Sequence, residues 1–297
     1  MDKKYKGVFT VICTAFDDKG DVDEAALRSH IRWQLDECKV HGIIPCGSTG
    51  EFAFLTPQER QRVVNIALDE VKKQVPVIAG AAACATREVI EAGNCYKEMG
   101  VDGIMVVPSY YGHLNQAELY GHYAEIARNV DLPVIIYNNP GTSGSDILPA
   151  TVAKLANEFE NIVAIKESTG SMQRVVDIQL LAGDNIEVVC GCDTLALEMF
   201  RMGVQGWIAA PANVFAKQCV KLYEQAVEQK DQAAAWEFYK QTRPIYDLFE
   251  NSGQYVALAK AGLEMLGRGI GKPRKPLAEA SAELRADLKV LLDKFYQ

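Results

Sequence analysis

Residues 75–107, VPVIAGAAACATREVIEAGNCYKEMGVDGIMVV, contain the pattern that decides the fold. A short apolar run starts at Val75, an amphipathic stretch begins near Thr86, and a second apolar run starts at Gly103. Short runs rich in β-branched residues and bounded by turn residues are typical of buried strands, whereas apolar residues at a 3.6-residue period are typical of a helix. The stretch therefore predicts one strand–helix–strand unit.

The same unit repeats on both sides of this stretch. Apolar runs start at Val8, Gly42, Val75, Gly103, Pro133, Ile162, Glu187 and Gly206. Amphipathic stretches begin near Asp23, Pro57, Thr86, Gln116, Pro149, Met172, Thr194 and Ala212, and Thr56 with Glu59 forms a capping box before the second of them. Eight βα units in about 210 residues predict an α/β fold, a (β/α)₈ TIM barrel.

A doubly wound sheet is the alternative architecture, since it is built from the same units. It usually carries a glycine-rich first turn that binds a dinucleotide. Here the first strand runs into Thr14-Ala15-Phe16-Asp17 with no G-x-G-x-x-G, which favours the barrel.

The chain after residue 212 is helical by period, with a break near Lys230-Asp231. Further helices are predicted over 254–266 and 281–296, and residues 267–277 form a Gly/Pro-rich linker. We expect the barrel to occupy residues 1–225 and a C-terminal helical extension to occupy residues 226–297.

Composition narrows the class of protein. The 297 residues are 48% hydrophobic and 24% charged, with a net charge of −8, which disfavours nucleic acid or an anionic membrane as a partner. The first residues lack the apolar stretch of a signal peptide, and no window approaches the roughly 20 apolar residues of a membrane span. The eight cysteines and four histidines show no zinc-ligand spacing, so we expect free thiols, a cytoplasmic location and no metal.

Lys166 is the first candidate for chemistry. It ends the run from Ile162, and side-chain alternation places it on the same face as Ala164 and opposite Val163 and Ile165. If the bulky pair packs on the helices, the amine points into the barrel mouth, where catalytic residues of this fold lie. A desolvated lysine loses its proton more readily, and the neutral amine attacks carbonyls to form a Schiff base. The alternative is a strand that simply ends and a lysine that reaches water.

Other chemically useful residues follow neighbouring strands. Tyr137 ends the run from Pro133 and offers a proton-transfer group, although it is also suited to a pocket wall. The loop 47–51, GSTGE, offers hydroxyls and backbone N–H groups to a carboxylate, and a plain tight turn is its alternative. It lacks the lysine of a nucleotide-binding P-loop. Tyr111 adds a second phenol after the run from Gly103.

Three motifs together resemble a known family. GSTGE at 47–51, YNNP at 137–140 and KES at 166–168 resemble the class I aldolases of the dihydrodipicolinate synthase and N-acetylneuraminate lyase family. The resemblance covers essentially the whole chain. It implies a TIM barrel, a homo-oligomer (dimer or tetramer) and no metal or organic cofactor.

The resemblance also implies residue roles. Lys166 would form an imine with pyruvate or another 2-oxo acid, and Tyr137 would shuttle protons. Ser48 and Thr49 would hold the substrate carboxylate and feed the proton relay, to which Tyr111 would contribute across a dimer interface. Further pocket residues implied in this way are Gly50, Thr142, Gly191, Asp193 and Ile208.

Two departures from the family pattern bear on the substrate. Lysine-pathway synthases place an arginine where this chain has Thr142, and a neutral hydroxyl does not replace a bidentate guanidinium. Sialic-acid lyases have an Asp-Glu pair where this chain has Asp193-Thr194, and a serine where it has Ala210. We therefore predict a Schiff-base aldolase or lyase with an unassigned acceptor.

Four alternatives remain open. The first two are 4-hydroxy-tetrahydrodipicolinate synthase, with another cation in place of the arginine, and a 2-keto-3-deoxy-sugar-acid aldolase or dehydratase. From other classes come a catalytically silent binding barrel and a pyridoxal-phosphate barrel. The intact lysine, tyrosine and hydroxyl set disfavours the silent barrel, and the absence of paired glycines for a phosphate disfavours the other.

Overall fold

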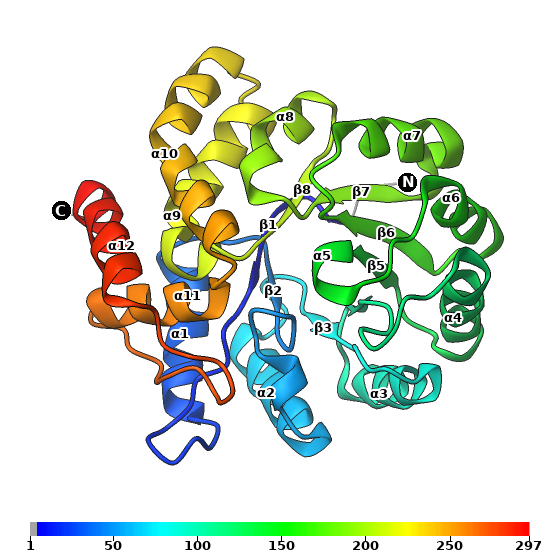
Figure 1. Cartoon of the computed structure of the whole chain (residues 1–297), viewed down its shortest axis with the longest axis horizontal. Helices are drawn as coiled ribbons and strands as arrows, with labels where there is room; N and C mark the ends of the chain where they lie inside the picture. The colour runs from blue at the N-terminus through cyan, green and yellow to red at the C-terminus, as the bar shows by residue number, and fades with distance from the viewer. Residues whose placement is uncertain (1–4, 297) are drawn as a thin grey trace. The chain divides into compact units, whose positions relative to one another are not determined.

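The computed structural model describes residues 5–296 and contains, within that range, one eight-stranded sheet (Figure 1). The strands are β1 (Gly7–Val11), β2 (Gly42–Ile44), β3 (Ile78–Gly80), β4 (Gly103–Val106), β5 (Val134–Asn138), β6 (Ile162–Glu167), β7 (Glu187–Cys190) and β8 (Gly206–Ala209). Their order is β2-β1-β8-β7-β6-β5-β4-β3, and a parallel bridge between Ile43 and Val77 joins the two ends of that order. An open doubly wound sheet has no such closure. The fold is a (β/α)₈ barrel, as predicted.

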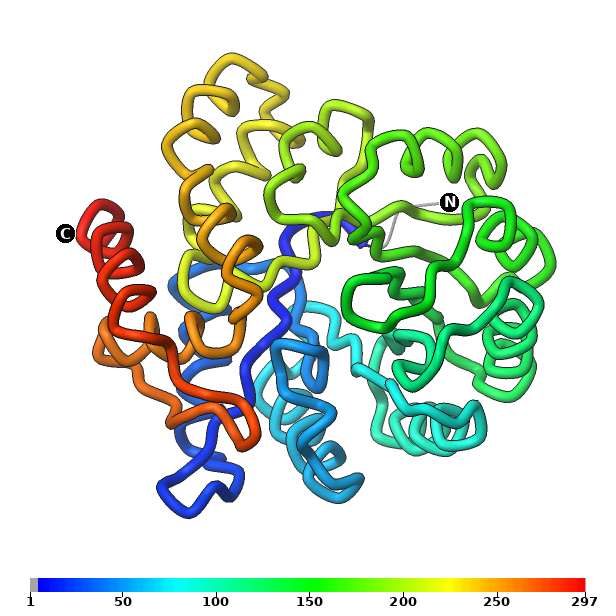
Figure 2. Tube along the Cα trace, viewed as in Figure 1, coloured from blue at the N-terminus to red at the C-terminus, as the bar shows by residue number. Residues whose placement is uncertain are grey.

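The chain forms two compact units, which are described separately. The first comprises Ile78–Ile208 with Tyr5 and Lys6, and its strands and helices alternate along the trace in Figure 2. Its helices are α3 (Thr86–Met99), α4 (Gln116–Asn129), α5 (Pro140–Ser143), α6 (Pro149–Glu158), α7 (Met172–Ala182) and α8 (Ala196–Arg201). Single 3₁₀ turns occupy Gly183–Asn185 and Asp193–Leu195.

The second unit comprises Gly7–Val77 and, among the described residues, 209–296. Its helices are α1 (Glu24–Asp36), α2 (Pro57–Val71), α9 (Ala212–Tyr223), α10 (Gln232–Ser252), α11 (Tyr255–Met265) and α12 (Ala282–Phe295), with a 3₁₀ turn at Phe52–Phe54 and a π-helical turn at Glu224–Glu228. The predicted tail helices and the break near residue 230 are confirmed. The boundary between residues 225 and 226 stays a prediction.

Local sequence signals set the helix ends. The side chain of Asp23 caps α1, and Thr56 and Glu59 form the predicted capping box of α2. Asn115 and Glu118 form a second capping box at the start of α4. The helical stretch predicted near Thr194 begins with the 3₁₀ turn at Asp193–Leu195 and continues as α8 from Ala196. Helix α5 was not predicted, since it is a single turn and is too short to show a period.

An aromatic cluster packs the C-terminal helices onto α9. The ring centroid of Phe215 lies 6.5 Å from that of Phe249 in α10 and 6.3 Å from that of Phe295 in α12, in edge-to-face arrangements. Such pairs stabilise beyond their buried area. The helices after residue 212 in this unit are therefore held by an apolar core shared with α9.

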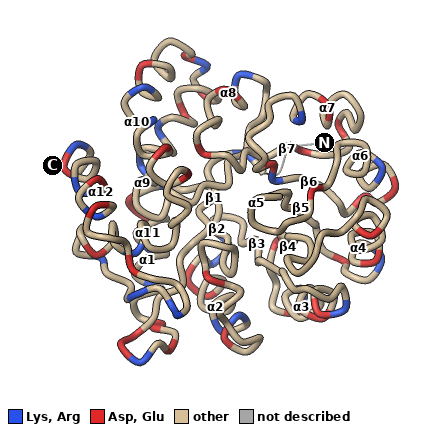
Figure 3. The backbone as a smooth tube through the Cα atoms, viewed as in Figure 1, with Lys and Arg blue, Asp and Glu red and all other residues tan. Residues whose placement is uncertain are grey.

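The described residues show a mixed distribution of charge and free thiols. Basic and acidic residues are interspersed along the helices (Figure 3), and several pair one turn apart, as Arg87 does with Glu91. Every cysteine is a free thiol, and only Cys84 is exposed. Residues 5–296 contain no group of His, Cys, Asp and Glu side chains arranged to hold a metal ion. None of their helices combines the length and the apolar character that crossing a membrane requires.

Candidate active site

Lys166 lies at the end of β6, directly beside Tyr137 of β5. The two residues are paired in the parallel register of these strands. Lys166 is only 6% exposed, and its Nζ lies 4.1 Å from the centroid of the Tyr137 ring. The alternative in which the lysine reaches water is therefore excluded. A buried amine held against the face of a phenol has a fixed position, which a reaction at that nitrogen requires.

The hydroxyl of Tyr137 is held by a residue two positions further along the chain. Asn139 donates a hydrogen bond from Nδ2 to the Tyr137 hydroxyl oxygen at 3.1 Å, and the tyrosine is itself buried. Asn139 precedes the short helix α5, and its carbonyl oxygen accepts hydrogen bonds from the backbone N–H groups of Thr142 (3.0 Å) and Ser143 (2.9 Å). The sequence analysis did not single out Asn139.

Gly191 packs directly on the stem of the lysine. A Cβ at this position would lie 2.7 Å from Cγ of Lys166 and 2.0 Å from Oγ of Ser168, and its N–H donates to the carbonyl of Glu167 at 2.9 Å. Only glycine fits without moving Lys166. Ser168 was also missed in the sequence: its Oγ is buried and has no hydrogen-bond partner within residues 5–296.

Two further predicted residues, Asp193 after β7 and Ile208 within β8, are both buried. Asp193 is 3% exposed, and its Oδ1 accepts a hydrogen bond from Nε1 of Trp207 at 2.8 Å. Ile208 is the next residue of β8 and is 2% exposed. One carboxylate oxygen of Asp193 is thus engaged by the protein itself.

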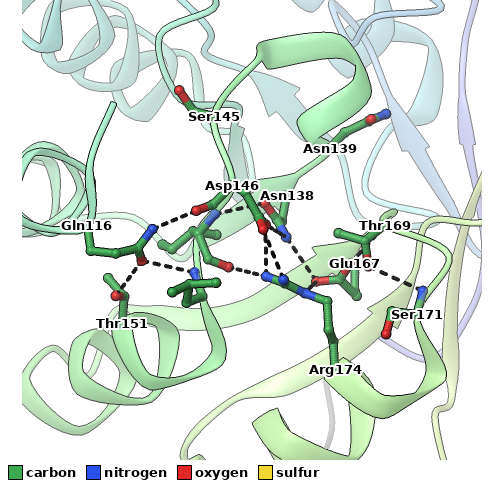
Figure 4. A network of polar contacts seen from close by, with 12 residues as sticks. Gln116, Asn138, Asn139, Ser145, Asp146, Thr151, Glu167, Thr169, Ser171 and Arg174 are labelled. Atoms are coloured by element: carbon green, nitrogen blue, oxygen red, sulfur yellow. Dashed lines mark hydrogen bonds and ion pairs between the residues drawn. The ribbon is translucent and has the colours of Figure 1, made fainter. Parts of the chain in front are cut away.

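A polar network involves the residues that follow Tyr137 and Lys166 in the sequence (Figure 4). Asn138 donates from Nδ2 to Oε2 of Glu167 (3.1 Å) and to Oδ1 of Asp146 (3.2 Å). Arg174 of α7 reaches the same two carboxylates, at 2.9 Å for Asp146 and 3.7 Å for Glu167. Because Asn138 and Glu167 are the sequence neighbours of Tyr137 and Lys166, the network fixes the ends of both strands.

Two predicted residues are exposed within the first unit. Tyr111, in the loop after β4, is 85% exposed. Thr142 lies in α5 and is also exposed. The loops that carry them are joined, since Leu114 donates its backbone N–H to Oγ of Ser145 at 3.0 Å.

The loop 47–51 belongs to the second unit and is buried there. Gly50 allows a close approach, because a Cβ would lie 2.9 Å from the carbonyl oxygen of Ile12, and its own carbonyl accepts from Oγ1 of Thr14 at 2.7 Å. Thr49 is 6% exposed and Ser48 is half-buried. The loop is therefore held by the residues that follow β1.

Glu51 ends this loop in a left-handed conformation and is 1% exposed. Its Oε1 lies 2.6 Å from Nζ of Lys260 in α11, and its Oε2 accepts the backbone N–H of Arg274 at 2.7 Å. Burial raises the pKa of the Glu51 carboxyl, while the positive charge of Lys260 opposes that rise. The hydrogen bond from the Arg274 guanidinium to Glu59 lowers the pKa of that carboxyl to about 2. The C-terminal segment thus holds the loop through ion pairs.

The structure therefore brings Lys166, Tyr137 and Gly191 together in the first unit, with Asn139 and Ser168 as additions. It places Ser48, Thr49 and Gly50 together in the second unit. The first unit offers an amine and a phenol, which are groups that reversible addition to a carbonyl uses. The loop of the second unit offers hydroxyls and backbone N–H groups.

The chain matches known proteins over nearly its whole length. The model of the dihydrodipicolinate synthetase family matches residues 4–295. The chain is 39% identical to the 4-hydroxy-tetrahydrodipicolinate synthase of Geotalea daltonii over 277 residues, which cover 93% of this chain and 94% of that protein.

The solved structures that resemble this chain include proteins of the same family. The chain is similar to dihydrodipicolinate synthase from Aquifex aeolicus, with a TM-score of 0.93, 34% identity and 98% of both chains covered. It is also similar to YagE, a prophage protein of E. coli K12 solved in complex with pyruvate, with a TM-score of 0.90, 28% identity and coverage of 97% of this chain and 98% of that one. These structures share the barrel fold.

Proposed function

The chain belongs to the dihydrodipicolinate synthetase family and is a class I aldolase, and we propose that Lys166 is the residue that forms its imine with pyruvate or another 2-oxo acid. The observation that carries this assignment is the position of its amine, buried and 4.1 Å from the centroid of the Tyr137 ring. A lysine free in water would be strongly hydrated and ill-placed for addition to a ketone.

The chemistry follows from the amine. Nζ of Lys166 adds to the keto carbon, the carbonyl oxygen becomes a hydroxyl, and loss of that hydroxyl as water leaves a cationic imine. The imine accepts the electron pair released when the C3–H bond or a neighbouring C–C bond breaks, which gives the enamine. Tyr137 supplies the proton that the departing hydroxyl needs and takes one back later, as a positioned acid–base group can.

Two further sets of residues complete the proposal. The backbone N–H groups of Ser48, Thr49 and Gly50 bind the substrate carboxylate, and the strict packing of Gly50 supports a loop that has to keep one conformation. Tyr111 is 85% exposed, which suits a phenol that reaches a partner subunit. We accordingly expect a homo-oligomer. The free thiols suit a cytoplasmic location.

The site for the acceptor substrate is proposed to lack the arginine that binds the acceptor's carboxylate in the lysine-pathway synthases. Thr142 offers a hydroxyl at the relevant position, and the guanidinium of Arg174 is already engaged by Asp146 and Glu167. The identity of 39% with a 4-hydroxy-tetrahydrodipicolinate synthase favours that activity as a second candidate. The two candidates differ in how well aspartate semialdehyde is bound.

We expect poor condensation of pyruvate with aspartate semialdehyde by the natural chain. The variant Thr142→Arg should lower the KM for the semialdehyde by about tenfold or more, because a charge-assisted hydrogen bond to a carboxylate contributes roughly 1.5–3 kcal/mol. The measurement is a coupled reductase assay over a range of semialdehyde concentrations, with Thr142→Lys as the matched monodentate cation. Efficient condensation by the natural chain would instead support the second candidate.

Borohydride reduction tests the imine directly. Incubation with pyruvate and borohydride should add one reduced pyruvate unit to the intact protein, and peptide mapping should place it on Lys166. The adduct should be absent without pyruvate. An adduct on another lysine, or none, would remove Lys166 from the proposed role.

A further inference from the structure

We propose that Asn139 is a positioning residue for proton transfer, which it supports by donating a hydrogen bond to the hydroxyl oxygen of Tyr137. The inference rests on the proposed function, because it assumes that Tyr137 moves the protons. Asn139 occupies the third place of the YNNP motif, a place to which the sequence analysis gives no role.

The contact is built into the backbone turn that follows β5. Asn139 Nδ2 lies 3.1 Å from the Tyr137 hydroxyl oxygen. The carbonyl of Asn139 is fixed at the start of α5 by the N–H groups of Thr142 and Ser143 and by the Oγ of Ser143 at 3.1 Å. The turn therefore holds the asparagine where its side chain meets the phenol.

The side chain of Asn139 lies apart from the polar network that Asn138, Asp146, Glu167 and Arg174 form. Figure 4 shows its amide turned away from the cluster of Asn138, Asp146, Glu167 and Arg174. Its neighbour Asn138 is fully buried and serves that cluster, whereas Asn139 is only half-buried. Replacement of Asn139 thus leaves the buried network intact, and its effect on proton transfer can be separated from its effect on folding.

The donated hydrogen bond acts on the phenol in two ways. The N–H occupies a lone pair of the oxygen, so the hydroxyl proton is directed to an acceptor other than Asn139. A donor also stabilises the phenolate more than the neutral hydroxyl, because a hydrogen bond to a charged group is the stronger one.

Proton donation by Tyr137 gains from that stabilisation, and the later return of a proton gains from the fixed position of the phenolate oxygen. When the hydroxyl on the carbon attached to Lys166 Nζ departs, the O–H bond of Tyr137 breaks, the proton joins the departing oxygen, and water and a phenolate result. The phenolate then takes a proton from C3 of the cationic imine, which leaves the neutral enamine and restores the hydroxyl. Asn139 holds the phenolate between these two steps.

Exchange of the pyruvate methyl protons with deuterated water measures these steps without a second substrate. The natural protein, Asn139→Leu and Asn139→Asp are compared by proton NMR. Leucine is similar in size and removes the donor; aspartate keeps the shape and adds a negative charge beside the oxygen. We expect the maximal exchange rate to fall about tenfold in the leucine variant and about 100-fold in the aspartate variant, as for loss of a hydrogen bond to a charged group, with KM for pyruvate changed by less than about twofold.

The same substitutions in a Tyr137→Phe background separate positioning from structure. With no hydroxyl to hold, Asn139→Leu and Asn139→Asp should reduce the remaining exchange by less than about twofold. Equal losses in both backgrounds, or full exchange in Asn139→Asp with Tyr137 present, would overturn the inference. If the natural protein gives no borohydride adduct on Lys166, the proposed function itself fails; if the adduct forms but Asn139 variants exchange normally, only the inference fails.

Discussion

Methionine in place of Lys166 is expected to reduce exchange of the pyruvate methyl protons by on the order of 10⁴-fold or more, down to the rate without enzyme. The side chain is similar in length and apolar, so it fills the site between Tyr137 and Gly191, but it cannot form an imine. Without the imine, no electron sink exists for the pair released at C3. The measurement is the NMR exchange assay, with circular dichroism and thermal unfolding to verify the fold.

Two controls sharpen that result. Lys166→Arg keeps a positive charge beside the phenol but cannot form the imine, so it should be as inactive as the methionine variant. Lys154→Met alters a 57% exposed lysine of α6 and should leave exchange unchanged. Appreciable activity in Lys166→Arg would show that charge alone accounts for the role of this residue.

The strands and the lysine were predictable because both depend on local patterns. Short apolar runs marked every strand, and the period-2 alternation of β6 placed Lys166 on one face of that strand. The capping boxes at Thr56 and Asn115 are likewise encoded within four residues. Such signals do not depend on what packs against the element.

Asn139, which no motif singled out, and the contacts made by the predicted Gly191 and Asp193 depend on geometry that no local pattern reports. Asn139 meets Tyr137 only because the backbone turns into a single helical turn immediately after β5. Position 191 is restricted to glycine because Lys166 and Ser168 pack against it. A sequence pattern does not show which residues pack against a glycine. Asp193 carries the right chemistry for a substrate ligand, yet its hydrogen bond to Trp207 could not be read from the chain.

Glu51 illustrates the same limit at long range. The motif GSTGE placed it beside the loop that carries Ser48 and Thr49, but its counter-ion Lys260 lies 2.6 Å away and comes from α11, far along the chain. A lysine within the largely apolar helix α11 gives no indication of its partner. The pair is almost completely excluded from water, with side chains 2% and 0% exposed.

Removal of one member of this pair should strongly destabilise the second unit. We expect Lys260→Met to lower the free energy of unfolding by about 3–5 kcal/mol, because the Glu51 carboxylate is left buried without its counter-ion. Urea denaturation at fixed protein concentration measures the change. Lys272→Met, which removes a 76% exposed lysine paired with Glu279, should have no measurable effect.

The loss should also depend on pH, in a direction set by Glu51. Burial already raises the pKa of this carboxyl above its ordinary value of 4.5, and loss of Lys260 removes the charge that opposes the rise. A group whose pKa is higher in the folded state supports folding below its unfolded pKa and loses that contribution as pH rises through the folded value. The destabilisation by Lys260→Met should therefore be larger at about pH 8 than at about pH 5.

A neutral double variant decides whether charge is the cause. Lys260→Met combined with Glu51→Gln leaves no buried charge at the pair, so most of the lost stability and its pH dependence should return, since neutral replacements of a buried pair are often tolerated. Equal destabilisation in the single and double variants, at both pH values, would assign the effect to packing around α11 instead. Recovery of stability would mean that neutral residues can replace the ion pair in the folded protein. The KM of the double variant for pyruvate would then test whether the loop 47–51 needs the ion pair for its proposed binding of the substrate carboxylate.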